Sequence, residues 1–177
     1  MPMIDVYAQP DTFAEPNQLA QDLATTLMEI EGVPAIPMFR NNTAAFVHTP
    51  AAISNVAGEG SYVRVQVLTN AGALNRDQQL AVVAKFTGIV AAAAGDESLK
   101  DRTWVLLTEA HDGGSWGLWG HAHTNEQLVG ASDQSRAAQH HRGPPPRGPG
   151  GSSSASAANC ASEVIPVLEE INTAASA

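Results

Sequence analysis

The fold is decided around positions 62–68, which read YVRVQVL. Apolar and polar residues alternate through this stretch, as they do in a strand with one buried side. Val63, Val65 and Val67 share the apolar side. The stretch therefore predicts a β-strand, and the segments on either side of it indicate what that strand belongs to.

A helix and a second strand follow this stretch. Asn75 and Gln78 have the spacing of a capping box, and Gly95 marks a helix end, so we expect a helix to about position 94. Its apolar stripe is expected to carry Leu80, Val83 and Val90, with Phe86 and Ile89 beside it. Residues 103–109, TWVLLTE, predict the next strand. Strand, helix and strand together make a β-α-β unit.

The same order of elements occurs earlier in the chain. Residues 3–7 and 44–48 predict strands, and Gly32 ends the helix between them. Thr12 and Glu15 have capping-box spacing at the start of that helix. The apolar stripe of the helix comprises Leu19, Leu23, Leu27 and Ile30. A polar loop is expected around 40–42. Leu19-Ala20 matches Leu80-Ala81, and Pro2 falls opposite Ser61.

Two β-α-β units in tandem predict an α/β (α+β) fold, a four-stranded mixed sheet with two helices on one face. We place this domain at residues 1–130, with units at about 2–57 and 61–130. The alternating valines make water an unsuitable neighbour for the other face, so self-association is the simplest expectation. Residues 131–177 are expected to form a low-complexity, largely disordered tail with a short helix at 162–175.

Composition excludes several classes of function. The formal net charge is −9 and the pI about 4.9, which argues against nucleic acid and anionic membranes as partners. The chain has one cysteine, so no intrachain disulfide is expected, which fits a cytoplasmic location. No signal sequence, membrane-spanning run or Gly-rich phosphate loop is found, and no cofactor is expected.

Three features together resemble the tautomerase superfamily, the group around 4-oxalocrotonate tautomerase and macrophage migration inhibitory factor. They are Met1-Pro2 leading directly into a strand, the tandem β-α-β units, and VLLTE at 105–109 followed by WGLWG at 116–120. The resemblance covers residues 2 to about 130. It implies a fused two-unit, long-chain member that assembles as a homotrimer.

The resemblance also implies that Pro2 is the catalyst. Removal of Met1 turns the Pro2 nitrogen into a secondary amine. An α-amino group titrates near about pH 8, and burial disfavours its cation. A neutral amine can take a proton from carbon next to a carbonyl and return it elsewhere, which is tautomerisation. The substrates that the resemblance implies are small keto or enol acids.

Further site residues follow from the same resemblance, which implies arginines and an aromatic wall around the substrate. Trp116 matches the aromatic position. Thr12 and Trp104 stand where short-chain family members have arginines. Arg40 and Arg64 are therefore the candidate ligands for a substrate carboxylate.

Other titratable residues have competing interpretations. His121 and His123 fall on one side of a strand, which would suit a metal pair, but no third ligand follows. His48 is either a second acid/base group or a plain strand residue. Glu29 and Glu31 end the first helix. Related dehalogenases and hydratases use an acid to activate water, although we expect both of these residues to be solvated.

The leading hypothesis is a Pro2-dependent tautomerase, an isomerase of small 2-keto or enol acids. One alternative keeps the scaffold but uses a cationic proline for hydration, dehalogenation or decarboxylation. The other is a non-catalytic, oligomeric binding protein.

Overall fold

The computed structural model describes residues 2–111, 116–118 and 121–141. It divides into two compact units, which we describe separately. The first comprises Met1–Ala35 and Phe39–His111, and the second comprises Ile36–Met38 and Asp112–Ala177. The first unit contains the sheet and the helices that both β-α-β repeats contribute.

The first unit is built on a four-stranded mixed sheet, which confirms the predicted fold. Its strands are β1 (Met3–Tyr7), β2 (Ala44–His48), β3 (Val63–Asn70) and β4 (Thr103–Ala110). They lie in the order β2-β1-β3-β4. β1 and β2 are parallel, β3 and β4 are parallel, and β1 runs antiparallel to β3 at the centre. Each repeat therefore contributes one parallel pair.

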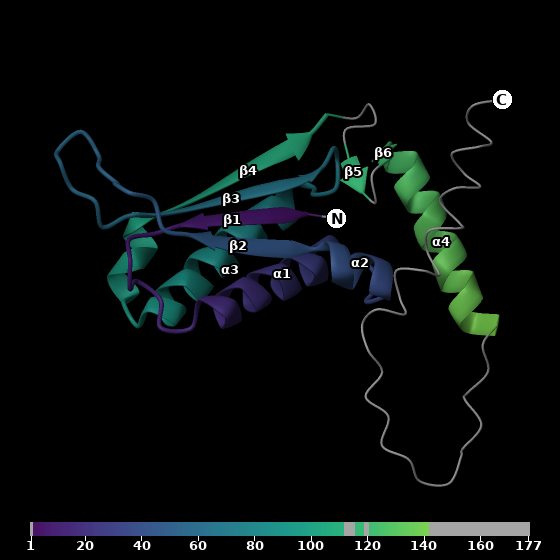
Figure 1. The fold of residues 1–177 in the computed structure, drawn as a ribbon, viewed down its shortest axis with the longest axis horizontal. Helices are drawn as coiled ribbons and strands as arrows, with labels where there is room; N and C mark the ends of the chain where they lie inside the picture. The colour runs from purple at the N-terminus through teal and green to yellow at the C-terminus, as the bar shows by residue number, and fades with distance from the viewer. Residues whose placement is uncertain (1, 112–115, 119–120, 142–177) are drawn as a thin grey trace, which may run out of the picture. The chain divides into compact units, whose positions relative to one another are not determined.

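Two helices, α1 (Pro16–Glu31) and α3 (Arg76–Ala94), cover one face of this sheet and pack against each other (Figure 1). The core lies between the helices and the sheet. It contains every second residue of β1 and β3, which keeps Ile4, Val6, Val65 and Val67 completely out of water.

The α1 stripe is confirmed, but the α3 stripe is shifted from the predicted one. Leu19, Leu23 and Leu27 are buried on α1, and Val82, Phe86 and Val90 are buried on α3. Leu80 is instead 52% exposed and Val83 39% exposed. Both helices bury a residue at every fourth position, so Leu19 corresponds to Val82 rather than to Leu80. The apolar composition of α3 on several sides had concealed which stripe faces the sheet.

The helix ends follow the sequence signals with one exception. Gly32 and Gly95 end their helices in the left-handed conformation, with φ of 70° and 64°. Asn75 and Gln78 form the predicted capping box. The Thr12–Glu15 box is wrong, because Glu15 caps α1 without a side-chain bond and the Thr12 hydroxyl donates to the Gln9 carbonyl at 2.8 Å.

Two short helices were not predicted. α2 (Pro37–Asn42) occupies the segment expected to be a polar loop, and the 3-10 helix η1 (Glu97–Arg102) leads into β4. Helices this short are marginally stable by themselves, so their formation depends on the surrounding tertiary structure more than on their own composition.

The uncovered face of the sheet differs from expectation. The valines of β3 point to the helices, so they do not create the need for a partner. The other face carries Phe46, Trp104 and Leu106, which are 48%, 49% and 45% exposed. These three side chains, spread over β2 and β4, are the apolar surface that a partner would cover.

The second unit consists of the hairpin strands β5 (Trp116–Leu118) and β6 (His121–His123) and the helix α4 (Asn125–His141). α4 crosses position 130, so residues 131–141 are helical rather than part of a low-complexity tail. Leu128 and Ala131 are buried, and the Pro/Gly-rich composition begins only after the helix. The predicted helix at 162–175 lies outside the described residues.

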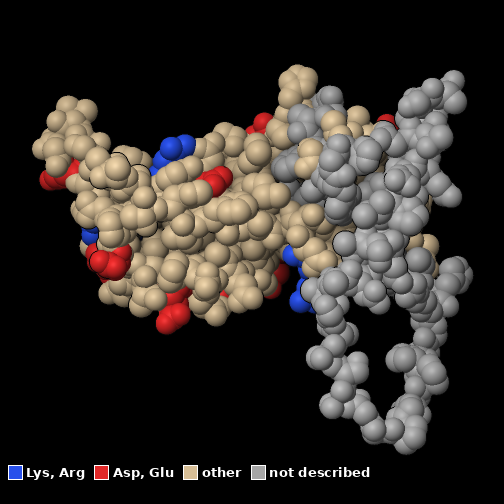
Figure 2. Space-filling view, in the orientation of Figure 1, with Lys and Arg blue, Asp and Glu red and all other residues tan. Residues whose placement is uncertain are grey.

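Two surface properties of the described residues bear on partners. Lys and Arg lie at scattered points on the face seen in Figure 2 and do not gather there into a patch. In the ranges that the structure describes, no helix is both long and apolar enough to cross a bilayer.

Candidate active site around Pro2

Pro2 lies immediately before β1, and its side chain is less than 2% exposed. Its carbonyl accepts a hydrogen bond from the Ala44 N–H at 3.4 Å. Because Met3 pairs with Ala44 on one side and Leu68 on the other, Pro2 lies between Thr43 and Thr69. We call the end of the sheet where β1 begins the Pro2 end.

Two helix ends meet at the Pro2 end. α1 returns from the end of β1 to the start of β2, so its last residues lie beside the first residues of both strands (Figure 1). α3 begins after β3, which also ends here. The Gln78 side chain donates to the Ile30 carbonyl at 2.6 Å and so joins the two helix ends. The start of β1 is thereby enclosed by protein.

Polar groups in this enclosure have unused hydrogen-bonding capacity. Thr43 and Thr69 are buried, at 8% and 3% exposure. Among the described residues, Thr43 Oγ1 and Asn70 Oδ1 are buried without a hydrogen-bond partner. Leaving such an oxygen unpaired costs about 1–3 kcal/mol, so a ligand with donor groups would be favoured here.

Glu31, the last residue of α1, is half-buried rather than solvated as expected. Burial raises the pKa of its carboxyl group, and the positive charge of the chain's N-terminus lowers that pKa in part. Glu29, two residues earlier on α1, is exposed.

Arg40 reaches a cavity beside the Pro2 end. The cavity has a volume of about 440 Å³, and its lining includes Arg40 from α2, Met28 and Glu29 from α1, and Thr43. Thr43 is also the strand neighbour of Pro2. Arg40 therefore lines a cavity together with Thr43, the residue just before β2.

Arg64 and Pro2 are not brought together within one chain. Arg64 pairs in register with Tyr7, at the opposite end of β1. Its guanidinium lies 5.2 Å from the centroid of the Tyr7 ring on the uncovered face, and it donates to the Gln66 side chain. Within one chain, Arg64 is therefore placed to contact a ligand or partner bound at the uncovered face, and not one bound beside Pro2.

The structure describes the backbone of the candidate residues Trp116, His121 and His123, but only the His123 side chain. Trp116 pairs with His123 in the second unit, but its side chain lies outside the described residues. The side chain of His121 is likewise outside them, whereas His123 is buried. Among the residues that the structure describes, no three His, Cys, Asp or Glu side chains form a group that could hold a metal ion.

His48 has a partner that the sequence did not indicate. Its Nε2 lies 2.6 Å from Asp5 Oδ1, and its ring stacks on Tyr7 with centroids 4.7 Å apart. Asp5 and His48 belong to strands that are distant in sequence but adjacent in the sheet, so only the strand pairing reveals the contact. The pair lies on the uncovered face, with His48 in register with Tyr7 rather than with Pro2.

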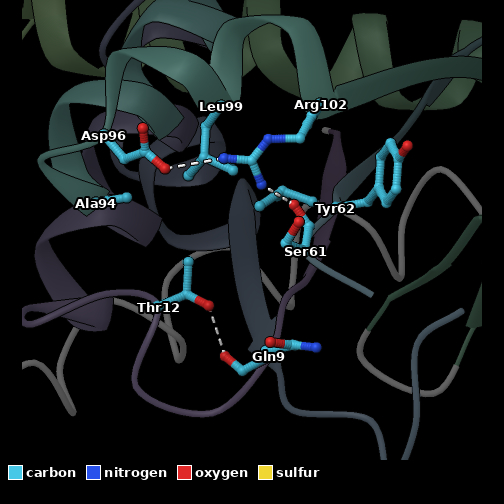
Figure 3. Close-up of a pocket in the computed structure, with 9 residues that line it drawn as sticks. Gln9, Thr12, Ser61, Tyr62, Ala94, Asp96, Leu99 and Arg102 are labelled. Atoms are coloured by element: carbon cyan, nitrogen blue, oxygen red, sulfur yellow. Dashed lines mark hydrogen bonds and ion pairs between the residues drawn. The ribbon is translucent and has the colours of Figure 1, made fainter. Parts of the chain in front are cut away.

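The second repeat has its own counterpart of the Pro2 end, at the opposite end of the sheet. A cavity of about 210 Å³ lies there, where β3 begins, and its lining includes Gln9, Thr12, Ser61, Asp96 and Arg102 (Figure 3). Ser61 thus occupies the neighbourhood in which the first repeat has Pro2, as the sequence comparison of the two repeats indicated.

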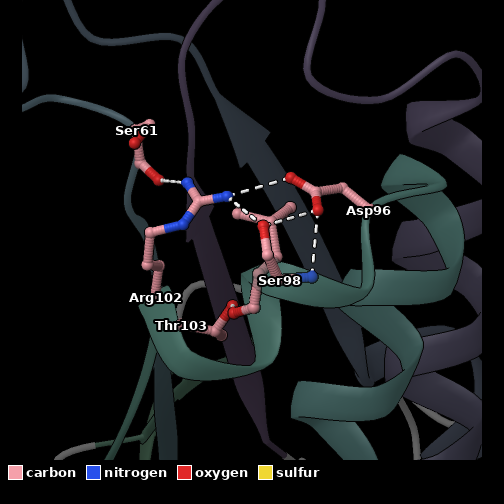
Figure 4. Close-up of polar contacts among 6 residues, drawn as sticks. Ser61, Asp96, Ser98, Arg102 and Thr103 are labelled. Carbon is pink, nitrogen blue, oxygen red and sulfur yellow. Dashed lines mark hydrogen bonds and ion pairs between the residues drawn. The ribbon is translucent and has the colours of Figure 1, made fainter.

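The arginine of this second cavity is already engaged. Arg102 Nη2 lies 2.9 Å from Asp96 Oδ2 and donates to Ser98 Oγ at 2.7 Å, and Nη1 donates to the Ser61 carbonyl (Figure 4). Hydrogen bonds from Ser98, together with the Arg102 charge, lower the pKa of Asp96. Arg102 therefore joins η1 to the start of β3. Its position directly before a predicted strand was the signal that sequence reasoning overlooked.

Sequence comparison finds no matching family model and no curated relative, so the likeness to known proteins rests on structure. A member of the cis-3-chloroacrylic acid dehalogenase family matches with a TM-score of 0.58 and 14% identity, over 78% of this chain and 96% of its own. A macrophage migration inhibitory factor homologue from Prochlorococcus marinus matches with a TM-score of 0.55 and 20% identity, over 68% of this chain and 97% of its own. A fused 4-OT described as an asymmetric trimer matches with a TM-score of 0.57 and 18% identity, over 71% of this chain and 98% of its own.

Each of these proteins is matched over nearly its whole length. The identities are low, so the matches concern the arrangement of the chain and not its activity. The chain therefore shares the fold of these proteins, a mixed four-stranded sheet built from two β-α-β units, as its sequence predicted.

Proposed function

We propose that the protein is a tautomerase, an isomerase that moves a proton between carbon and oxygen of a small 2-keto or enol acid through the Pro2 amine. The observation that carries the proposal is the burial of Pro2 at the start of β1, where a processed N-terminus would place a secondary amine out of water. The fold shared with proteins of the dehalogenase, 4-OT and migration inhibitory factor groups supports it.

The reaction needs only one proton carrier. With Met1 removed, the neutral ring nitrogen of Pro2 takes the enol proton from the substrate, and the resulting enolate is protonated at carbon by the same nitrogen. Arg40 is the candidate ligand for the substrate carboxylate because it lines the cavity that Thr43 shares. Arg64 would serve a site only from a neighbouring copy, and Trp116 is the proposed apolar wall.

The direct test compares Pro2→Ala with the unaltered chain, both without an N-terminal tag, in the ketonisation of phenylenolpyruvate. Alanine also permits removal of Met1 but leaves a flexible primary amine, so we expect the rate to fall by about a hundredfold or more. Pro10→Ala, in an exposed loop, is the matched control and should retain the full rate. Equal rates for Pro2→Ala and the unaltered chain would defeat the proposal.

A second candidate function uses a cationic proline for hydration, dehalogenation or decarboxylation. The half-buried carboxyl group of Glu31 at the end of α1 favours it, because hydration and dehalogenation need an acid that activates water. The pH–rate profile separates the two functions. Activity that requires the neutral amine rises with pH, whereas activity that requires the cation falls.

A homotrimer and a cytoplasmic location belong to the same proposal. The trimeric fused 4-OT supports the assembly, and so do the apolar side chains on the uncovered sheet face. A non-catalytic binding protein would be indicated instead if intact-mass measurement showed that the mature chain retains Met1, since no free proline amine would then exist.

A further inference from the structure

β2 lies at one edge of the sheet, with α1 alongside it (Figure 1). Within the described part of the chain, no strand pairs with its outer side. The Ala44 N–H and the His48 carbonyl both bond toward β1 and its flanking residues. Because backbone groups change side at each residue of a strand, those of Ala45 and Val47 point away from the sheet and are open to pairing.

Two adjoining cavities lie along this edge, between α1 and β2. The lining of one, of about 410 Å³, includes Ala44 and Ala45, and the lining of the other, of about 440 Å³, includes Arg40. Ala24 and Thr43 line both cavities. We call the two cavities together the edge groove. Its alanines leave room for another backbone to approach β2 closely.

The edge groove has unused polar groups where β2 begins. Thr43 is 8% exposed, and its Oγ1 lacks a hydrogen-bond partner. Rotation about χ1 exchanges the positions of its methyl and hydroxyl groups, which would turn the oxygen toward a ligand. None of the ion pairs of the described residues includes Arg40. Glu29 also lines this part of the groove, but it is exposed, so solvent screens its charge.

These features match one kind of partner. Outward N–H and C=O groups on an edge strand pair with an extended chain, and an unpaired guanidinium at the end of the groove suits a carboxylate. A peptide that ends in a free C-terminus offers both in one segment. A small carboxylate would use Arg40 but leave the strand edge unpaired.

We propose that the edge groove binds the C-terminal segment of another protein, which adds to β2 as an extra strand and places its carboxylate at Arg40. Because Arg40 precedes β2, the bound segment runs antiparallel to β2. Pairing with the strand edge supplies affinity for any extended sequence, and Arg40 selects a chain end. The inference goes beyond the proposed function and shares only Arg40 with it.

The test follows the backbone amides of the full, ¹⁵N-labelled chain by NMR. The probe is a pool of N-acetylated hexapeptides of random sequence with a free C-terminal carboxylate, and the same pool with C-terminal amides is the comparison. The free-acid pool should shift the Ala45 and Val47 resonances. The amidated pool should bind about tenfold more weakly, because it loses a charge-assisted bond. Absence of shifts at β2 would overturn the inference.

Variants test the two halves of the site separately. Arg40→Ala should abolish the difference between the pools, whereas Arg76→Ala, exposed on α3, should preserve it. Ala24→Leu fills the groove and should weaken both pools about tenfold or more, whereas Ala92→Leu, exposed on α3, should weaken neither. Leucine is a good helix former, so a loss confined to Ala24→Leu reports the groove and not the helix. A difference between the pools that survives in Arg40→Ala would refute the carboxylate site.

Hydrogen exchange shows whether the groove is open in the chain alone. The Ala45 and Val47 N–H groups should exchange fast, because they bond to water. Protection at both positions would mean that the edge is already paired, which contradicts the inference, and protection that grows with protein concentration would identify a second copy as the occupant. Pro2→Ala should bind the free-acid pool as the unaltered chain does. Loss of activity in that variant and loss of peptide binding are therefore independent results, and either proposal can fail without the other.

Discussion

Two glycines of α3 differ in whether the backbone requires glycine at their position. Gly95 ends α3 with φ of 64°, a conformation in which a Cβ is strained even though nothing lies within 4 Å of it. Gly88 lies inside the same helix, also with nothing within 4 Å, and has no unusual φ. The first position requires glycine, and the second only tolerates it.

At the residue scale, Gly95→Ala should destabilise the protein by about 1 kcal/mol because alanine must adopt the left-handed conformation. Gly88→Ala should stabilise it by about 0.5–1 kcal/mol because alanine loses less entropy in a helix. Urea unfolding of both variants measures the free energies. Changes of the same sign in the two variants would contradict this account.

The contact between α1 and α3 depends on one side chain. Gln78 Oε1 accepts from the Asn75 N–H at 2.9 Å, and its Nε2 donates to the Ile30 carbonyl at 2.6 Å. The same amide therefore caps α3 and satisfies a carbonyl at the end of α1. This joins the start of the second repeat's helix to the end of the first repeat's helix, next to Pro2.

At the scale of elements, Gln78→Ala should lower the free energy of unfolding by about 1–2 kcal/mol, since it removes both bonds and leaves a carbonyl without its partner. Gln79→Ala is the matched control, because its side chain makes only a 3.4 Å contact to the Leu74 carbonyl. Thermal unfolding followed by circular dichroism measures the two variants. Equal losses would show that Gln78 does not join the helices.

For the whole molecule, the two faces of the sheet have different occupants. The helices cover one face, and Phe46, Trp104 and Leu106 remain exposed on the other. The Asp5–His48 pair and the Arg64–Tyr7 contact lie on this same face. A mixture of apolar and paired polar groups is typical of an interface between copies of a chain.

At this scale, Leu106→Lys should dissociate the proposed trimer, because an unpaired charge buried in an interface is strongly unfavourable. Leu80→Lys is the matched control. Leu80 is exposed to a similar extent but lies on α3, at 52% against 45% for Leu106. Light scattering on size-exclusion peaks gives the masses. A monomeric unaltered chain, or a Leu106→Lys variant with unchanged mass, would refute the assembly.

The sequence by itself determined the elements that depend on neighbouring residues. The alternation at 62–68 marked a strand, the Asn75–Gln78 spacing marked a helix start, and Gly32 and Gly95 marked helix ends, because each signal acts over a few residues. It failed where local signals were ambiguous: α3 is apolar on several sides, and Thr12 bonds to Gln9 instead of capping α1.

The tertiary structure alone decided which residues meet. The antiparallel pairing of β1 and β3 puts the second repeat's cavity at the opposite end from Pro2, and it leaves Arg64 beside Tyr7. Helix packing leaves Glu31, which the sequence suggested was solvated, half-buried at the end of α1. Burial and charge coupling depend on distances between segments far apart in the chain, and strand register and helix packing set those distances.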